Sequence, residues 1–465
     1  MAQARMAWEH LVTQERLGRE ADVVPQRHRT NFQQDFDRIV FSSAFRRLQD
    51  KTQVFPLAES DYVRTRLTHS LEVSCVGRSL GTKVGEEVAA REGFELVDPG
   101  DFGAIVAAAC LAHDIGNPPF GHSGEDAIQH WFATSVIGAE ALGALSGRQA
   151  AEFRRFEGNA QGLRVVTRLQ NPDNEGGLQL TFATLGAALK YPRPAHRTDP
   201  QDGVSGKKHG YFAAEEGHFR RVVEKTGMLP VDDTGEVYCR HPLAFLMEAA
   251  DDISYQIVDF EDSYRLGLLS FEDVERHIRP ILRDDERLTR RLGQIGSDKE
   301  RVEYLRARAI NQLVEETAAV FLEREAEILA GAFDRELKEL IPSADAMAEI
   351  KRTSFDRIYN AKGVLEIDAA GFGVLGGLLE TFYHPVRETA EAERAGRLRE
   401  DASAHSRTVA QLVPDQFLYD PVSGQRLTDP YMLLLNLTDF VSGMTDGYAV
   451  SLYKKLTGIS LPHRG

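Results

Sequence analysis

The 465-residue sequence contains few cysteines and few long apolar runs. Cys75, Cys110 and Cys239 are widely separated and form no CxxC pair, which excludes a disulfide framework in a chain this long and suits a reducing cytoplasm. The longest apolar stretch, around residues 104–112, is too short to span a bilayer, and the N-terminal MAQARMAWEH lacks the apolar core of a signal peptide. We therefore expect a cytoplasmic protein with no membrane partner.

Basic residues are also in the minority. The chain has 55 Lys and Arg against 71 Asp and Glu, a formal net charge of -16, which argues against a dedicated nucleic-acid binder. The first part of the chain runs against this sign, with the basic residues Arg27, His28, Arg29, Arg46, Arg47, Arg64 and Arg66. This clustering suits a small anionic ligand, with ordinary surface charge as the alternative.

Helical patterns dominate what is present, and strand-like alternation is scarce. Apolar residues recur at helical spacing along 67–88 and 246–264, and the Glu/Arg-rich stretch 298–340 has the pattern of one or two long helices. At 98–112, Asp98 is a candidate N-cap and Pro99 a first helical residue, followed by an apolar run. These patterns predict a mainly α-helical fold.

Proline and glycine concentrate between residues 191 and 217. Structureless loops of this length are uncommon in compact domains unless they bind or cover something. We expect a long functional loop or a small irregular insert there.

The chemically informative segment is HDIGNPPFGHSGE, residues 113–125. A lone His-Asp pair is weak evidence, but His113 and Asp114 end an apolar helix, where buried polar groups need partners. A divalent metal would satisfy both, and backbone hydrogen bonds are the alternative. His69 on the preceding helix and Asp251 on a later one would complete a ligand order of His, His-Asp and Asp.

This order and the segments around it resemble the HD phosphohydrolase superfamily, specifically the bacterial dGTP triphosphohydrolases. The segments that carry the resemblance are FRRLQDKTQVFP (45–56), RTRLTHS (64–70), HDIGNPPFGHSGE (113–125), FEGNAQ (156–161), LKYP (189–192), MEAADDI (247–253) and GMTD (443–446). The resemblance implies an all-α fold, in which an HD-domain helical core carries additional helical elements, and a homo-oligomer that is usually a hexamer.

Three regions are expected along the chain. Residues 1–60 would form an N-terminal arm and helices that contribute to the nucleotide site. Residues 61–275 would form the HD phosphohydrolase core, with the irregular insert at about 191–217, and residues 276–465 a C-terminal helical region.

Helical geometry selects Asp251 over its neighbour Asp252 as a ligand. At about 100° per residue, Asp251, Tyr255 and Asp259 share one face of a helix, and Asp252 is turned away from it. A solvated polar face is the alternative. The resemblance implies that Tyr255 packs against the deoxyribose, excluding a ribonucleotide by steric conflict, and that Asp259 hydrogen-bonds the 3′-hydroxyl.

His122 and Glu125 are predicted to form the catalytic pair. They stand three residues apart, so on one helical turn the carboxylate can orient the imidazole. The resemblance implies that His122 faces the α-phosphate, where it either deprotonates the attacking water or protonates the departing 5′ oxygen. A histidine on an exposed loop near a glutamate is the alternative.

The sequence has no GxxxxGK[ST] loop for binding phosphates. By resemblance, the triphosphate contacts are Arg66, Lys190 and Lys208, with Asn159 and Tyr191 in support; Lys207 competes with Lys208 for its role. Gln53 corresponds by resemblance to a residue that contacts guanine, because its carboxamide offers both a donor and an acceptor. A purely structural glutamine is the alternative.

The resemblance predicts metal-dependent hydrolysis of a dNTP, with dGTP preferred, to deoxynucleoside and inorganic triphosphate by metal-assisted attack of water on the α-phosphate. Mn or Mg is the expected metal, with Co, Ni, Fe and Zn as alternatives. A nucleotidase acting on another nucleotide and a single-stranded-DNA-responsive regulator with a residual site are the alternative functions. Single-stranded DNA or a dNTP is considered as an effector, and Arg352, Arg357 and Lys362 as groups that reach a neighbouring subunit's site.

Overall fold

The computed structural model describes residues 5–20, 28–53, 64–93, 97–283 and 286–459. Within these ranges the chain forms helices joined by loops, and β-structure is limited to isolated bridges such as that between Thr52 and Thr65. The expected all-α fold is therefore confirmed. Arg27 and residues 54–56 of the FRRLQDKTQVFP segment lie outside the described residues.

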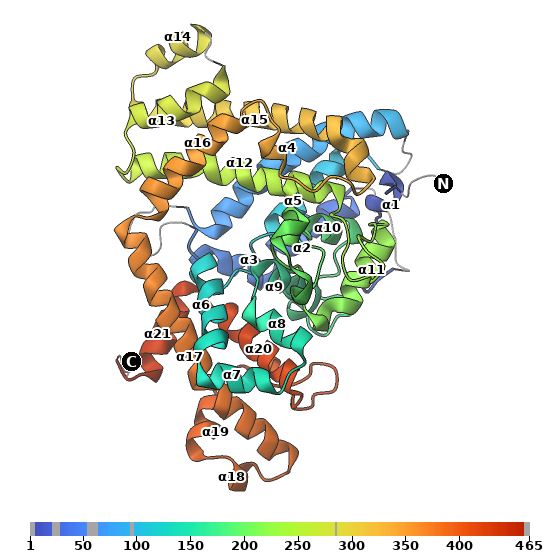
Figure 1. Ribbon diagram of the computed structural model, residues 1–465, viewed down its shortest axis with the longest axis vertical. Coiled ribbons are helices and arrows are strands. Elements are labelled where there is room, and N and C mark those ends of the chain that lie inside the picture. Colours follow the sequence, from blue (N-terminus) through green and yellow to red (C-terminus); the bar gives the residue numbers. More distant parts are fainter. Residues whose placement is uncertain (1–4, 21–27, 54–63, 94–96, 284–285, 460–465) are drawn as a thin grey trace.

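Three helices form the centre of the upper half of the molecule in Figure 1: α4 (Arg66–Glu92), α5 (Pro99–Ala112) and α12 (Pro242–Arg265). Thr65 caps α4 by accepting the backbone N–H of Thr68, and α5 begins with Pro99 after Asp98, as expected. The helices predicted over 67–88, 98–112 and 246–264 are confirmed.

Helices α4 and α5 pack unusually closely because small residues line their contact. Gly77, Gly81 and Gly85 recur on successive turns of α4 and face α5. A β-carbon at Gly77 would lie 2.5 Å from Cys110 Sγ, and one at Gly81 would lie 2.6 Å from the Phe102 carbonyl oxygen. Any larger residue would force the two helices apart.

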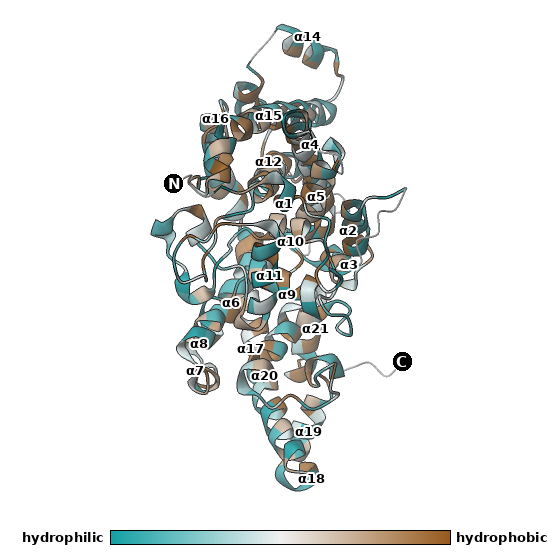
Figure 2. Cartoon of the chain, turned by 90° about the vertical axis from the view of Figure 1, so that its right-hand side faces the viewer, coloured by the Kyte–Doolittle hydropathy of each residue, from teal (hydrophilic) through white to brown (hydrophobic). Residues whose placement is uncertain are grey.

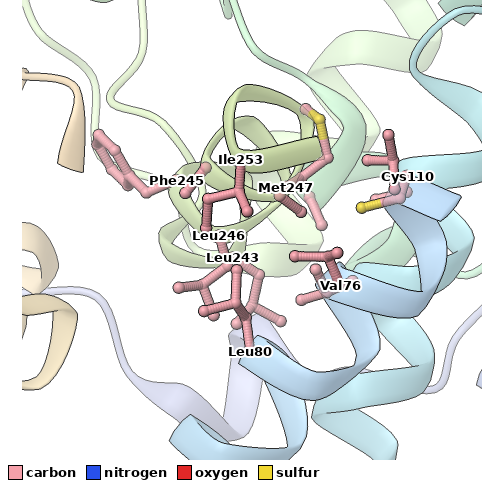
Figure 3. Packing of buried hydrophobic residues seen from close by; sticks show 14 of the residues in the cluster. Val76, Leu80, Cys110, Leu243, Phe245, Leu246, Met247 and Ile253 are labelled. Atoms are coloured by element: carbon pink, nitrogen blue, oxygen red, sulfur yellow. The ribbon is translucent and has the colours of Figure 1, made fainter. Parts of the chain in front are cut away.

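Helix α12 closes this core from a third side. Figure 3 shows Leu243, Leu246 and Ile253 of α12 directed toward Val76 and Leu80 of α4. All five side chains are at most 7% exposed. Apolar burial of this extent fixes the relative positions of the helices that carry His69, His113 and Asp251.

The remaining helices surround these three. The N-terminal elements are α1 (Trp8–Leu11), α2 (Asn31–Val40), α3 (Ser43–Arg47) and the 3₁₀ turn η1 (Leu48–Asp50). The middle elements are α6 (Gly121–Thr134), α7 (Val136–Gly143), α8 (Gly147–Arg154), α9 (Gly158–Arg164), the π-helical turn η2 (Val165–Leu169), α10 (Phe182–Ala188) and α11 (Glu216–Thr226).

After α12 the chain forms a second set of helices. These are α13 (Phe271–Ile278), η7 (Arg279–Leu282), α14 (Glu286–Gln294), α15 (Asp298–Leu329), η8 (Leu337–Glu339), α16 (Ala344–Ser354), the π-helical turn η9 (Phe355–Tyr359), α17 (Lys362–Arg394), α18 (Leu398–Asp401), α19 (Ala404–Ala410), η10 (Asp415–Phe417), α20 (Pro430–Ser442) and α21 (Asp446–Leu456). The long helix expected in 298–340 is α15.

The segment at 191–217 is irregular, as expected. It contains only the short 3₁₀ turns η3 (Ala195–Arg197), η4 (Pro200–Asp202), η5 (Val204–Gly206) and η6 (Ala213–Glu215) before α11 begins. It is nevertheless well anchored, because Arg193 is 2% exposed and donates to Asp202 and to the Arg197 carbonyl.

A second apolar core lies in the lower half of Figure 1, where α6 and α7 pack with α17 and α20. Trp131 and Phe132 of α6 meet Leu375, Phe382 and Phe440 in this core. Helices from before residue 275 therefore share a core with helices from the C-terminal region. The expected division at 60 and 275 stays a prediction.

A buried ion network connects the two halves. Arg164 at the end of α9 is 1% exposed, and its guanidinium donates to Asp439 of α20 and to Glu215. Both carboxylates are themselves buried. A buried arginine with two carboxylate partners fixes the orientation of α20 relative to α9.

The surface and interior of the molecule separate as expected for a globular chain. Figure 2 shows hydrophilic residues along outer helices such as α8 and α11 and hydrophobic segments toward the interior. Within the described ranges, none of the helices is both long and apolar enough to cross a membrane.

The close contact between α4 and α5 gives a testable expectation. We expect Gly81→Ala to lower the free energy of unfolding by about 1–3 kcal/mol and to weaken Mn²⁺ binding, because overpacking separates the helices that carry His69 and His113. Gly100→Ala is the matched control, since a β-carbon there meets no atom within 4 Å. Urea unfolding and Mn²⁺ titration of both variants measure the effect, and equal behaviour of the two would contradict it.

Candidate metal centre and nucleotide site

The predicted ligands come together where α4, α5 and α12 meet. His69 stands one turn into α4, His113 directly follows α5, and Asp251 lies in the middle of α12. The ligand atoms of His69, His113 and Asp114 all lie within 4.8 Å of one another. Asp251 Oδ1 is 3.1 Å from His69 Nε2 and 3.6 Å from His113 Nε2.

The His113 ring is oriented for a ligand. Its Nδ1 donates a hydrogen bond to the Cys110 carbonyl at 2.6 Å, which leaves Nε2 facing the cluster. Nε2 is buried and has no hydrogen-bond partner among the described residues. Two atoms that bind one ion at about 2.1 Å lie about 3.0–3.4 Å apart at angles between 90° and 109°. The distances from Asp251 Oδ1 to the two imidazole nitrogens, 3.1 and 3.6 Å, and from Asp114 Oδ1 to His113 Nε2, 3.4 Å, are close to this range, so the cluster fits a divalent metal.

Electrostatics at the cluster agree with this fit. Burial opposes a charged ring, but the carboxylates of Asp114 and Asp251 outweigh it and raise the pKa of His113 to about 9. Burial alone would raise the pKa of Asp251, yet the two histidines hold it well below its usual range. The cluster therefore concentrates negative charge around imidazoles that must lose a proton before a metal binds.

Asp252 points elsewhere, as the helical geometry predicted. Its carboxylate accepts a hydrogen bond from Lys338 Nζ at 2.6 Å. The alternative of a solvated polar face does not fit the structure, because Asp259 is buried, Tyr255 is half-buried and only 24% of the Asp251 side chain is exposed.

Asp114 is held by two further side chains. Arg66 Nη1 donates to Oδ2 at 2.7 Å, and Asn117 Nδ2 donates to Oδ1 at 2.6 Å. Arg66, a predicted triphosphate contact, is 4% exposed. It lies beside the metal cluster, because it is bonded to the proposed ligand Asp114. Hydrogen bonds of this kind orient a metal ligand and tune its basicity.

His122 and Glu125 both lie in the first turn of α6 but are not bonded to each other. The His122 side chain is accessible to solvent and makes no hydrogen bond or ion pair with any described residue. Glu125 is buried, and its carboxylate accepts from the Gly158 N–H at 2.7 Å and from Lys208 Nζ at 3.3 Å. Tertiary partners therefore occupy the carboxylate that was expected to orient the imidazole.

The environment of His122 favours its neutral form. Part of the His122 ring reaches solvent, but the protein atoms packed around the rest of it disfavour the charged form and lower the pKa of His122, and the positive charges of Lys208 and Arg66 lower it further. A histidine whose pKa lies below its ordinary value is neutral at pH 7 and can accept a proton.

Lys208, Asn159 and Glu157 form one cluster next to Glu125 of α6. Lys208 Nζ lies 2.9 Å from Glu157 Oε2, and Asn159 Nδ2 donates to Glu157 Oε1 at 2.7 Å. Asn159 and His113 line the same small cavity. Two of the predicted phosphate contacts are therefore brought together, next to the metal cluster.

Lys190 and Tyr191 form a second cationic cluster. Lys190 Nζ lies 3.3 Å from Glu248 of α12 and 5.9 Å from the centre of the Tyr191 ring. Arg240 also pairs with Glu248, at 2.6 Å. Although burial opposes it, Glu248 raises the pKa of Lys190 well above its ordinary value, so this lysine stays charged.

The predicted sugar-binding residues share the half of α12 beyond Asp251. Tyr255 is half-buried, and Asp259 is 4% exposed and accepts a hydrogen bond from the Tyr359 hydroxyl at 2.6 Å. Burial raises the pKa of Asp259 to about 7. The Tyr359 hydroxyl therefore donates to the carboxylate that was predicted to bind the 3′-hydroxyl.

The remaining predicted residues lie at the margins. Gln53 is half-buried, and its Oε1 has no hydrogen-bond partner among the described residues. Arg352, Arg357 and Lys362 are exposed and pair with Glu349, Asp273 and Glu366 of their own chain. Their contact with a neighbouring subunit stays a prediction.

Sequence reasoning missed Glu157, Glu248 and Tyr359. Glu157 and Glu248 lie in the FEGNAQ and MEAADDI segments, which carry the family resemblance. The sequence did not reveal that Glu157 pairs with Lys208 and Glu248 with Lys190. Tyr359 is 100 residues from Asp259 in sequence, and no local pattern points to it.

Comparison with known proteins now identifies the fold and the family. Residues 66–165 match the family model described as HD domain. A deoxyguanosinetriphosphate triphosphohydrolase-like protein of Synechocystis sp. is 45% identical over 462 residues, which cover 98% of this chain and 100% of that relative. A protein of the same description from Pseudomonas aeruginosa is 39% identical over 464 residues, with the same coverage.

A deoxyguanosinetriphosphate triphosphohydrolase of Cronobacter sakazakii is 32% identical over 488 residues, covering 92% of this chain and 94% of that relative. The protein is therefore an HD-domain protein. It belongs to the deoxyguanosinetriphosphate triphosphohydrolase-like family of that class.

The choice of Asp251 gives a testable expectation. We expect Asp251→Asn to lower Mn²⁺ affinity at least tenfold, since a neutral amide is a poorer ligand than a carboxylate. Asp252→Asn, one residue away, should retain affinity because Asp252 pairs with Lys338. Isothermal titration with Mn²⁺ compares the two variants, and an equal loss of affinity in both would show that the assignment is wrong.

Proposed function

We propose that this protein hydrolyses a deoxynucleoside triphosphate, with dGTP preferred, to deoxynucleoside and inorganic triphosphate. The observation that carries the proposal is the cluster of His69, His113, Asp114 and Asp251, with His122 close by and not bonded to any side chain that the structure describes. The names of the relatives support the substrate class. The gathering of Arg66, Lys190 and Lys208 around the cluster supports a highly anionic substrate.

His69, His113, Asp114 and Asp251 would hold the metal ion. When bound, a divalent ion supplies Lewis-acid polarisation of the α-phosphoryl group and lowers the pKa of a bound water. Mn²⁺ or Mg²⁺ is proposed, with Co, Ni, Fe or Zn as alternatives, because imidazole and carboxylate ligands serve all of these metals to different degrees.

His122 is proposed as the group that moves the proton. Because its neutral form is favoured, its free nitrogen can accept a proton from the attacking water at neutral pH. Lys208 would bind the triphosphate by exchanging its carboxylate partners for phosphate oxygens. The role of Glu125 as the residue that orients His122 stays a prediction, since Gly158 and Lys208 occupy its oxygens.

For substrate selection, Tyr255 and Asp259 would bind the deoxyribose and Gln53 the base. Asp259 would receive the 3′-hydroxyl in place of, or beside, the Tyr359 hydroxyl. Among the described residues nothing donates to the buried Gln53 Oε1, and this supports base recognition, because a buried acceptor without a partner is satisfied when a ligand donates to it.

The function is tested by product analysis of the wild-type protein and a histidine variant. With dGTP and Mn²⁺, we expect deoxyguanosine and inorganic triphosphate. His122→Ala should lower kcat by about 10²–10⁴-fold, the usual contribution of general acid-base catalysis, while Mn²⁺ affinity is kept. His130→Ala is the control, because His130 is exposed on the same helix.

Two results would contradict the proposal. Near-normal turnover of His122→Ala would remove the proposed role of this residue. Release of orthophosphate or pyrophosphate in place of triphosphate would show that the protein is a nucleotidase of a different type.

We also propose a place for a nucleotide effector, in a cavity of about 940 Å³ on the other side of the 115–117 turn. Its lining includes Arg38 and Arg47 together with Phe417 and Tyr448, and two acidic side chains, Asp173 and Asp439, of which Asp439 is paired with Arg164. Arg47 has no carboxylate partner among the described residues. Cations and aromatic rings around a cavity of this size suit a nucleotide better than an extended polyanion, which the charge of -16 repels.

Stimulation by a second nucleotide tests this cavity. We expect one of the other dNTPs to raise the rate of dGTP hydrolysis, and Arg47→Ala to lower the stimulation ratio at least fivefold, as loss of a charged contact requires. Arg46→Ala, at the exposed neighbouring position, should keep the ratio. Stimulation by single-stranded DNA alone, or equal ratios in both variants, would contradict the proposal.

A hexameric assembly and a cytoplasmic location stay predictions. The first follows from the resemblance and the second from the scarcity of cysteine.

A further inference from the structure

The C-terminal helix α21 begins with a buried carboxylate that binds two distant parts of the chain. Asp446 is 2% exposed. One of its oxygens accepts a hydrogen bond from the Phe120 N–H at 3.1 Å. The other accepts from the Thr52 N–H at 3.0 Å and from the Thr52 hydroxyl at 2.6 Å. The carboxylate thus joins segments that are 326 and 394 residues away in sequence.

The first of these segments is the turn that starts α6. Phe120 has a φ of 64°, a left-handed conformation that is unfavourable for any residue with a β-carbon. Such a conformation persists only where the surrounding structure imposes it. The hydrogen bond to Asp446 and the packing of the ring against Gly371 of α17 impose it here. His122 follows two residues later, so the direction of its side chain depends on this turn.

The second segment comprises residues 51–53, which include Gln53. Thr52 pairs with Thr65 across a short bridge, and the Lys51 carbonyl accepts the Arg66 N–H at 3.2 Å. The same stretch is therefore tied to the start of α4, three residues before His69. A shift of Thr52 would move Gln53 relative to the metal cluster.

A second side chain joins the same three segments. Lys51 is 4% exposed, and its Nζ donates to the carbonyls of Asn117 and Ser442. Asn117 opens the turn that leads to Phe120, and Ser442 ends α20 just before α21. Lys51 and Asp446 together therefore hold the 51–53 stretch, the 117–122 turn and the start of α21 in one arrangement.

We propose that Asp446 is a positioning residue that sets His122 and Gln53 relative to the metal cluster and so couples turnover to base selection. The inference rests on the proposed function, because His122 and Gln53 have their roles there. Asp446 contacts neither the cluster nor His122, so it acts only through Phe120 and Thr52. The GMTD segment, residues 443–446, thereby receives a role in the reaction.

Asp446→Asn is the direct test, because an amide keeps one acceptor oxygen and so cannot hold both segments. We expect kcat/KM for dGTP to fall by about 10–100-fold, as for a small misplacement of a catalytic group, and the ratios of kcat/KM among the four dNTPs to narrow. The kcat-against-pH profile should also shift, because His122 changes its surroundings. Ala449→Gly is the control, since it loosens the same helix at a buried position without touching either segment.

A merely structural role predicts a different result. Asp446→Asn and Ala449→Gly would then lose activity in proportion to their loss of Tm, with dNTP ratios and pH profile unchanged in both. That outcome would overturn the inference. If Asp446→Asn does not fold, Thr52→Val is the second test, because it removes only the hydroxyl hydrogen bond to Asp446. We expect Thr52→Val to narrow the ratios of kcat/KM among the four dNTPs and to leave the pH profile of kcat unchanged. Unchanged ratios would overturn the inference.

A crystal structure of Asp446→Asn separates this inference from the proposed function. We expect Phe120 to leave the left-handed region and the 117–122 turn to move, whether or not the protein hydrolyses dNTPs. An unchanged turn would overturn the inference. A wild-type protein without triphosphohydrolase activity would overturn the proposed function but leave this structural result to decide the positioning role.

Discussion

The close contact between α4 and α5 is the constraint on which the site depends. Because Gly77, Gly81 and Gly85 present no β-carbon, the backbones approach until the His69 and His113 rings lie 5.5 Å apart, centre to centre. Helix α12, packed on both, then brings Asp251 within reach of the two rings. The metal cluster is therefore a consequence of helix packing, and its ligands need little adjustment to share one ion.

The three cations proposed to bind the triphosphate are each paired with a carboxylate. Arg66 pairs with Asp114, Lys190 with Glu248, and Lys208 with Glu125 and Glu157. Pairing keeps these groups charged in a buried site, at a desolvation cost that a lone cation could not offset. These cations are therefore already charged and in place when a triphosphate binds, and the site favours a polyanionic ligand.

Sequence reasoning predicted the parts of this site that depend on local geometry. Helix positions follow from apolar spacing and capping residues, and the choice of Asp251 over Asp252 needed only the angle between successive residues of a helix. Contacts between distant segments were out of reach: Tyr359 with Asp259, Glu157 with Lys208, and Asp446 with Thr52 and Phe120. The spacing of His122 and Glu125 did not reveal that Gly158 and Lys208 bind the Glu125 carboxylate, so the orienting role of Glu125 stays a prediction.

Anomalous diffraction from crystals grown with Mn²⁺ tests the central claim most directly. The packing of α4, α5 and α12 predicts one strong peak bound by His69, His113, Asp114 and Asp251, with bonds of about 2.1 Å to the imidazole nitrogens. A peak at any other position, or none between these four side chains at saturating Mn²⁺, would contradict the assignment of a metal centre.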